Sequence, residues 1–197
     1  MQQPLVKISK SNLPNINGEI EIISLTRDTD KTNVLSCKTN YIVILPFEKT
    51  ANDTIKSIYG LKFENHATGQ TDTTLLIDSV DPSKDQTPID TIYRSLLEEA
   101  GLNIEELGIT EDDIFYLGNI STSTPISSKF KCYAIDLTNI SKPDSQFNFT
   151  RTLAKSPFNK DSSEIVKLGF HQVVNGDFSD STILSGAFLL VSYFNWN

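Results

Sequence analysis

The stretch Arg94-Ser95-Leu96-Leu97-Glu98-Glu99-Ala100-Gly101-Leu102 ends the best-defined helix that the sequence predicts. Thr87 is a suitable N-cap for this helix, Pro88 suits its first position, and Asp90 can complete a capping box. Gly101 is expected to end it, because glycine readily adopts the left-handed conformation found after a helix. Between these signals the apolar residues recur at the spacing of one helical face, at Ile89, Ile92, Tyr93, Leu96, Leu97 and Ala100.

This stretch resembles the second half of the Nudix box, whose pattern is G-x5-E-x7-R-E-U-x-E-E-x-G-U, with U an aliphatic residue. With Arg94 placed on the arginine of the motif, the residues that agree with it are Arg94, Leu96, Glu98, Glu99, Gly101 and Leu102. The resemblance implies a Nudix fold. It also implies a site in which glutamates hold Mg²⁺ or Mn²⁺ against a diphosphate.

The first half of the motif agrees poorly. Val80 stands at the opening glycine, Gln86 at the first glutamate and Ser95 at the glutamate that follows the arginine. Hard divalent cations need several oxygen ligands, and carboxylates four residues apart on a helix provide two of them. Here that pair would be Ser95 and Glu99, so one carboxylate is missing. Glu98 and Glu99 are neighbours about 100° apart around the helix, and Glu98 can pair with Arg94 one turn earlier.

The loop before the helix departs from the family as well. Many relatives carry a glycine here that lets the backbone approach the metal-bound phosphates, but residues 77–82 contain no glycine. Val80 is β-branched and cannot adopt a positive φ cheaply, so the loop must take another path. If activity remained, Asp85 or Asp90 would have to replace the missing glutamates.

The remaining elements fit the same fold. The apolar run Tyr41 to Phe47 predicts a central strand that is buried on both faces. Other expected strands cover residues 5–8, 19–25, 55–63, 73–77, 114–118, 130–137 and 164–170, and a last helix covers 182–194. We therefore expect a Nudix-type α/β/α sandwich whose mixed sheet lies between the two helices. Residues 1–40 would form an N-terminal β extension and residues 41–197 the Nudix-like domain.

The long polar segment 141–163 is the expected functional loop. In the similar enzymes this loop supplies a glutamate that acts as a general base or positions the water. Asp161 and Glu164 are the acids near its end, and either could fill that role. The alternative is that both are solvated surface carboxylates.

Composition limits the classes of partner. The chain has 197 residues and a net charge of −8 with no basic stripe, which argues against binding to nucleic acid. The apolar runs Tyr41 to Phe47 and Ala187 to Val191 are both too short to cross a membrane, and we expect a protein that is not secreted. Cys37 and Cys132 lack a metal-type spacing and are expected to be reduced core residues.

Three functions follow as hypotheses. In the first, the chain is a Nudix-like pseudoenzyme without a cofactor, which binds protein partners as a structural subunit of a larger assembly. A virus particle would fit, because a long polar loop and free termini usually need a partner to hold them in place; the cytoplasm is the other location. In the second, it is an active Mg²⁺-dependent pyrophosphatase of ADP-ribose or another nucleoside diphosphate derivative. Glu98 and Glu99 would then bind the metal. A third, weaker possibility is a pocket that binds a nucleotide without hydrolysing it.

Overall fold

The computed structural model describes residues 6–12, 20–27, 30–37, 40–65, 69–100, 102–121, 126–127, 129–140, 150–151, 163–176, 178 and 180–196. Its main sheet has eight strands, six of them in the order β11-β12-β5-β4-β10-β8, with β6 pairing to β5 and β7 to β4. The strands of this sheet are β4 (Tyr41–Lys49), β5 (Ile55–Asn65), β6 (Gln70–Thr74), β7 (Leu76–Ser79), β8 (Ile114–Ser121), β10 (Lys129–Asp136), β11 (Thr150–Arg151) and β12 (Ser163–Gly169). The sheet is mixed, because β10 runs parallel to β4 and the other pairs are antiparallel.

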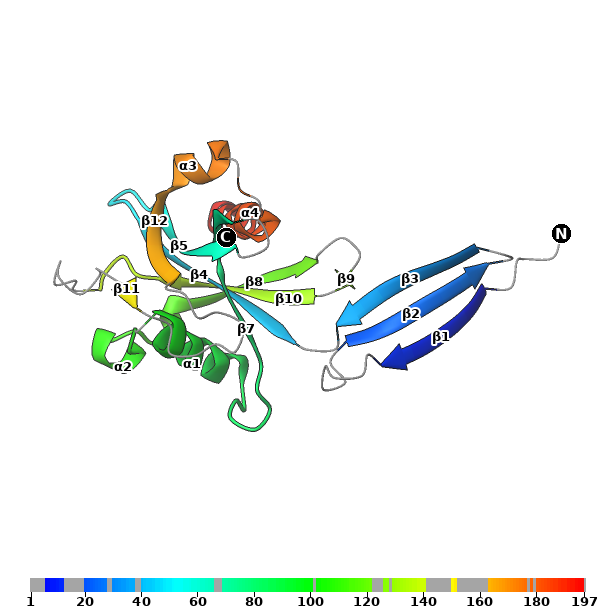
Figure 1. Ribbon diagram of the computed structural model, residues 1–197. Coiled ribbons are helices and arrows are strands. Elements are labelled where there is room, and N and C mark those ends of the chain that lie inside the picture. The colour runs from blue at the N-terminus through cyan, green and yellow to red at the C-terminus, as the bar shows by residue number, and fades with distance from the viewer. Residues whose placement is uncertain are drawn as a thin grey trace.

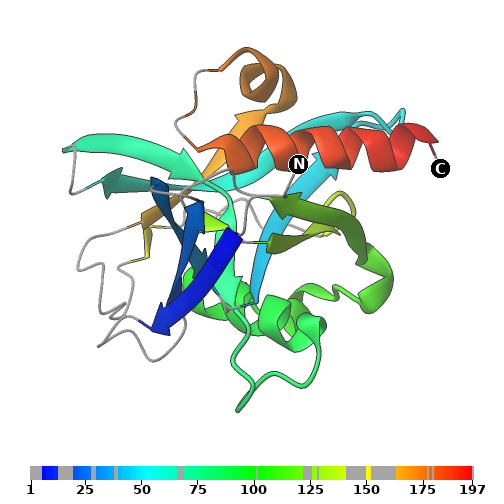
Figure 2. The ribbon, with the colours of Figure 1, turned by 90° about the vertical axis from the view of Figure 1, so that its right-hand side faces the viewer.

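Helices cover both faces of this sheet, as expected for an α/β/α sandwich. Figure 1 shows two helices, α1 and α2, on one face and another two, α3 and α4, on the other. The view in Figure 2 again places α4 and α1 on opposite sides of the sheet. The helices are α1 (Pro88–Ala100), α2 (Ile104–Leu107), the 3-10 turn η1 (Glu111–Asp113), α3 (Phe170–Asn175) and α4 (Ser181–Trp196). The predicted sandwich is therefore confirmed. No helix among the described residues is long and apolar enough to span a membrane.

β4 is the central strand, as its continuous apolar run predicts. Its residues alternate between the two faces, so that one strand contributes to two separate cores. Ile42 and Ile44 pack in the core on the α1 side with Ile92 and Leu96. On the α4 side, the residues from β4 are Val43, Leu45 and Phe47, and they pack with Ile183, Ala187 and Leu190.

The start of α1 follows its predicted capping box. The Asp90 Oδ2 atom accepts hydrogen bonds from the backbone nitrogen and the hydroxyl of Thr87, at 2.7 and 3.0 Å. In return, the Asp90 backbone nitrogen donates to the Thr87 hydroxyl at 3.3 Å. Gly101, the expected end of the helix, lies outside the described residues.

Several expected boundaries were wrong. The single strand expected at 73–77 is two strands, because the chain leaves the ladder at Leu75, so that β6 continues along β5 while β7 pairs with β4. The expected strand 164–170 ends at Gly169, and Phe170 begins α3, a short helix that the sequence pattern does not predict.

Cys132 is a free, buried thiol whose pKa is raised to about 12 by burial, which confirms its expected place in the core.

The N-terminal strands form a separate sheet that projects away from the sandwich (Figure 1). Its order is β1-β2-β3-β9, with β1 (Val6–Asn12), β2 (Ile20–Arg27), β3 (Asp30–Cys37) and β9 (Ile126–Ser127). β9 belongs to the connection between β8 and β10 and pairs in parallel with β3, with Leu35 opposite Ile126. The sequence predicts β1 and β2 but not β3, and this sheet is not built from residues 1–40 alone. The domain boundary at residue 40 stays a prediction.

Candidate functional site

Arg94 ties α1 to the loop and strand that precede it. Its Nε and Nη2 atoms donate to the two carboxylate oxygens of Asp85 at 3.1 and 2.8 Å. Nη1 donates to Asp78 Oδ2 at 2.8 Å, and Nη2 also donates to the backbone oxygen of Ser79 at 2.9 Å. Asp78 and Ser79 end β7, so one guanidinium fixes the path of the loop between β7 and α1. We refer to Arg94, Asp78, Asp85, Glu98 and Glu99 as the acidic corner.

Asp85 is the most buried carboxylate of this corner, with its side chain 2% exposed. Besides Arg94, it accepts hydrogen bonds from the Thr91 hydroxyl at 2.9 Å and from the Asp81 backbone nitrogen at 2.8 Å. The hydrogen bonds from Arg94 contribute most to holding the pKa of Asp85 far below its usual value, and the same pair raises the pKa of Arg94. The carboxylate oxygens of Asp85 are therefore occupied by hydrogen bonds that hold the loop before α1, and Asp90 accepts the hydrogen bonds of the helix cap. Neither carboxylate is left to replace a missing metal ligand.

Ser95 occupies the position of the missing glutamate and lies in the interior. Its residue is 0% exposed, and its hydroxyl has no hydrogen-bond partner. It belongs to the buried stripe of α1, between Thr91 one turn earlier and Ala100 further on. The sequence predicts the loss of a carboxylate here, but it does not predict that the hydroxyl is unpaired.

The two glutamates of the motif differ in their surroundings. The Glu98 side chain is 56% exposed, and its Oε2 atom lies 3.5 Å from Arg94 Nη1, as the four-residue spacing predicts. Glu99 is partly buried, and burial raises its pKa, with a further contribution from the negative charges of Asp78 and Glu98. Burial also raises the pKa of Asp78, against the lowering effect of Arg94. The three carboxylates thus share one electrostatic environment, with Arg94 as its cation.

This arrangement does not fit a divalent cation such as Mg²⁺. A magnesium ion needs several oxygen ligands that converge in octahedral geometry. Over the part of the chain that the structure describes, no group of three or more His, Cys, Asp or Glu residues could hold a metal ion. The carboxylates of Asp78, Asp85 and Glu98 instead turn to the guanidinium of Arg94.

The two acids predicted to act as general base cannot be placed against this corner. Asp161 lies outside the described residues. Glu164 belongs to β12, where its backbone pairs with Lys62 of β5 and Thr150 of β11. The catalytic role of either residue stays a prediction.

A second polar cluster, which the sequence pattern does not predict, lies on β4, β5 and β12. Glu48 is 7% exposed, and its carboxylate accepts from the Tyr59 hydroxyl at 2.6 Å and from Lys167 Nζ at 2.5 Å. The Ser57 hydroxyl donates to the same carboxylate at 3.3 Å. Burial raises the pKa of Tyr59 to about 12. An acidic residue inside the apolar strand β4 was the available sign of this cluster.

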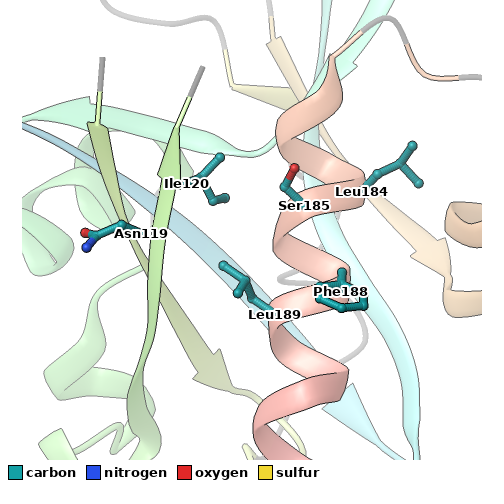
Figure 3. Close-up of a pocket in the computed structure, with 6 residues that line it drawn as sticks. All are labelled: Asn119, Ile120, Leu184, Ser185, Phe188 and Leu189. Carbon is teal, nitrogen blue, oxygen red and sulfur yellow. The ribbon is translucent and has the colours of Figure 1, made fainter. Parts of the chain in front are cut away.

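An apolar groove lies on the other face of the sheet. A groove of about 410 Å³ runs between β8 and α4, and its walls are Asn119, Ile120, Leu184, Ser185, Phe188 and Leu189. Figure 3 shows Ile120 on the side of β8 that is turned to α4, and Leu189 on the side of α4 that is turned to β8. Phe188 is 72% exposed. Because α4 and α1 cover opposite faces, this apolar groove is separate from the acidic corner.

Comparisons with known proteins identify the fold. No protein-family model matches the sequence, and no curated protein matches it. Among solved structures, the chain is similar to an ADP compounds hydrolase with a TM-score of 0.58 and 13% identity, over 100% of this chain and 96% of that one. It is also similar to the Nudix domain of NrtR from Shewanella oneidensis, solved as a complex with ADP ribose. The TM-score is 0.51 and the identity 12%, over 78% of this chain and 86% of that one. Identities this low speak for the fold alone, so the chain has the Nudix fold.

Proposed function

We propose that this Nudix-fold chain has impaired or absent catalysis and serves as a structural or interaction subunit of a larger assembly. The observation that carries the proposal is Ser95. A buried, neutral hydroxyl stands where the motif requires a carboxylate four residues before Glu99. A hydroxyl is a weak ligand for magnesium and adds no charge against a diphosphate.

The partners of the other acids support the same conclusion. Asp85, the nearest replacement for the first glutamate of the motif, gives both carboxylate oxygens to Arg94. Asp78 and Glu98 also lie beside that guanidinium. A metal site built here would have to break these ion pairs, and breaking the buried pair of Arg94 and Asp85 alone costs about 3–5 kcal/mol.

Two surfaces support a role in assembly. Phe188 and Leu184 on α4 are 72% and 42% exposed beside the apolar groove. The N-terminal sheet that the structure describes has four strands, β1, β2, β3 and β9, and it projects away from the helices of the sandwich (Figure 1). Small sheets usually need a second layer for stability, and exposed apolar patches often mark interfaces. We infer protein partners, in a virus particle or another multi-subunit particle of the cytoplasm, and neither nucleic acid nor a membrane.

Hydrolysis of ADP-ribose tests the catalytic half of this proposal. Purified protein would be incubated with ADP-ribose and Mg²⁺ or Mn²⁺, and release of AMP would be measured against Glu99→Gln. Glu105→Gln, which changes an exposed glutamate of α2, is the matched control. We expect the same background rate in all three proteins. Metal-dependent release that is lost in Glu99→Gln and kept in Glu105→Gln would refute the proposal.

The mass of the protein in solution tests the assembly half. Analytical ultracentrifugation should find oligomers, or a stable complex with a second protein when the chain is purified from its natural source. A monomer at every concentration, with no co-purifying partner, would count against a structural subunit.

An active pyrophosphatase is the second candidate. It is favoured by the similarity in fold to an ADP compounds hydrolase and to a domain solved with ADP ribose. In that case Glu98 and Glu99 would hold Mg²⁺, and Asp161 or Glu164 would position the water. The AMP assay separates the two candidates directly.

A further inference from the structure

The helix α4 has a composition that does not suit a helix on the outside of a sandwich. None of its 16 residues, from Ser181 to Trp196, is charged. A helix without a charged face is normally buried on all sides. The sheet lies on one side of α4 (Figure 2), and away from it Phe188 is 72% exposed and Leu184 42% exposed. The outer face of α4 is therefore suited to being covered by a partner.

This outer face has a projection and a hollow side by side. Phe188 and Leu184 stand one turn apart on the same face of the helix. The groove of about 410 Å³ that both residues line extends to Ile120 of β8 (Figure 3). Such a surface can pair with an identical surface across a two-fold axis, because each copy then offers its projection to the hollow of the other.

Charge favours an identical chain as the occupant. The protein has a net charge of −8, so two copies repel each other on average. Like α4, the strand β8 has no charged residue, and the six residues that line the groove are all uncharged. Asp180, which precedes α4, accepts hydrogen bonds from the Thr182 backbone nitrogen at 2.8 Å and from the Thr74 hydroxyl. Two copies can therefore approach here without bringing like charges together.

We propose that a second copy of this chain covers the outer face of α4, with the Phe188 side chain of each copy seated in the groove of the other. A lipid surface fits less well, since helices that lie on membranes usually carry Lys or Arg on their polar face, and α4 has neither. This proposal rests on the proposed function, and it names one protein partner of the assembly and the surface that binds it.

The size of the surface predicts a weak dimer. A 16-residue helix is about 24 Å long and about 10 Å wide, so that it covers about 240 Å² of a partner. Even with the groove side of β8 added, this is well below the roughly 800 Å² that a standard interface buries on each partner. We therefore expect a Kd in the micromolar range and a monomer–dimer equilibrium that responds to protein concentration.

Sedimentation equilibrium at concentrations from about 1 μM to about 1 mM, which include this range of Kd, tests the proposal. The proteins are the natural chain, Phe188→Glu, Leu184→Lys and the matched control Leu97→Glu. Leu97 is 48% exposed and belongs to α1, on the opposite face of the sheet. Phe188→Glu should raise the Kd at least about 30-fold, as expected for an aromatic residue at the centre of an interface. Leu97→Glu should leave the Kd unchanged, and thermal unfolding confirms that each variant is folded.

A mixture of Phe188→Glu and Leu184→Lys tests whether the partner is an identical surface. In either variant alone, like charges meet near the two-fold axis. In a mixed dimer, the glutamate introduced into one copy faces the lysine introduced into the other, and opposite charges across an interface attract. The mixture should therefore dimerise at least about 10-fold more tightly than either variant alone.

Four results would overturn the proposal. The natural chain stays monomeric at about 1 mM. Phe188→Glu weakens the dimer no more than Leu97→Glu does, which would place the interface elsewhere. The mixture dimerises no more tightly than its two components. The natural chain is monomeric but sediments with vesicles of phosphatidylcholine and phosphatidylserine, and Phe188→Glu does not, which would make lipid the occupant.

Failure of this proposal and failure of the proposed function are distinguishable. Metal-dependent AMP release from a dimer that Phe188→Glu disrupts would refute the loss of catalysis and leave the interface in place. A monomer that binds a different protein would refute the α4 dimer and leave the role in an assembly in place.

Discussion

Replacing Asp85 by asparagine should remove a large part of the stability of this fold. The Asp85 carboxylate is 2% exposed and bonds to two nitrogens of Arg94, to the Thr91 hydroxyl and to the Asp81 backbone nitrogen. An asparagine keeps one acceptor oxygen and turns an amide donor toward the donors of Arg94. Breaking a buried pair in this way costs about 3–5 kcal/mol, and we expect about 3 kcal/mol because one acceptor survives. That loss lowers the melting temperature by about 6–12 °C.

The dependence of this loss on pH identifies its origin. The pKa of Asp85 is lowered in the folded state, chiefly by hydrogen bonds from Arg94. A carboxyl whose pKa is lower in the folded state than in the unfolded state stabilises the fold at pH values above the unfolded pKa of about 3.9. This contribution is lost as the pH falls toward the pKa of the folded state. The difference between the natural chain and Asp85→Asn should therefore be the same at pH 7 and pH 5, and smaller at pH 3 by about 1 kcal/mol.

Urea unfolding at the three pH values measures this difference. Asp112→Asn, at an exposed position of η1, is the control and should lie within about 0.5 kcal/mol of the natural chain at each pH. A loss below about 1 kcal/mol at pH 7 would refute the reasoning, since that is the range of exposed ion pairs. A difference that widens toward pH 3 would refute it as well.

Three further substitutions test other parts of the structure by urea unfolding. Ser95→Ala should be neutral within about 0.5 kcal/mol or slightly stabilising, because it removes a buried hydroxyl without a partner. Gly186→Ala should cost up to about 2 kcal/mol, because its Cβ atom would lie 2.8 Å from the Cδ1 atoms of Leu45 and Leu75, and a gain of about 1 kcal/mol in helix propensity offsets part of this overpacking. Glu48→Gln should cost about 1–3 kcal/mol, because the neutral amide is a poorer partner for a tyrosine hydroxyl and a lysine.

Control variants at neighbouring positions test the first two predictions, and one outcome would exclude the third. Thr91→Ala removes a hydroxyl on the same buried stripe that does have a partner, Asp85 Oδ2, and should cost about 1–2 kcal/mol. A greater loss in Ser95→Ala than in Thr91→Ala would contradict the account of Ser95. Ser185→Ala changes the residue before Gly186, on the side of the groove, and should leave the free energy of unfolding nearly unchanged. Equal losses of stability in Ser185→Ala and Gly186→Ala would therefore exclude close packing of Gly186 against Leu45 and Leu75 as the cause. An unchanged free energy of unfolding in Glu48→Gln would mean that the charge of Glu48 is not needed.

The sequence predicted those parts of the fold that depend on interactions between residues close together in the chain. The capping box and the apolar face of α1 lie within one continuous segment, and the strand from Tyr41 has no competing pattern. β3 was missed because Thr32, Asn33 and Ser36 weaken its apolar alternation, and its strand forms by pairing with β2. The interruption at Leu75 was missed because Leu75 continues into the apolar residues Leu76 and Ile77 without a turn signal.

In the candidate site, too, contacts within one helix could be predicted from the sequence, and contacts between separate segments could not. Glu98 pairs with Arg94 at a fixed helical spacing, so the sequence predicted that contact. The stronger contacts of Arg94, to Asp78 and Asp85, join a helix to a preceding strand and loop, and no periodic pattern encodes their distance. Asp85 stands one residue before the motif position held by Gln86, which was the available sign that a carboxylate could reach Arg94.

The parallel pairing of β4 with β10 has a consequence for synthesis. Tyr41 pairs with Phe130, so the most apolar strand of the chain must wait for a distant partner before its second edge is closed. Until the ribosome has delivered residues 129–136, one edge of that strand presents open hydrogen-bonding groups, and its face on the α4 side stays uncovered until residues 181–196 follow. The nascent chain should therefore be most prone to aggregate, and most dependent on chaperones, in the interval between the emergence of these two segments.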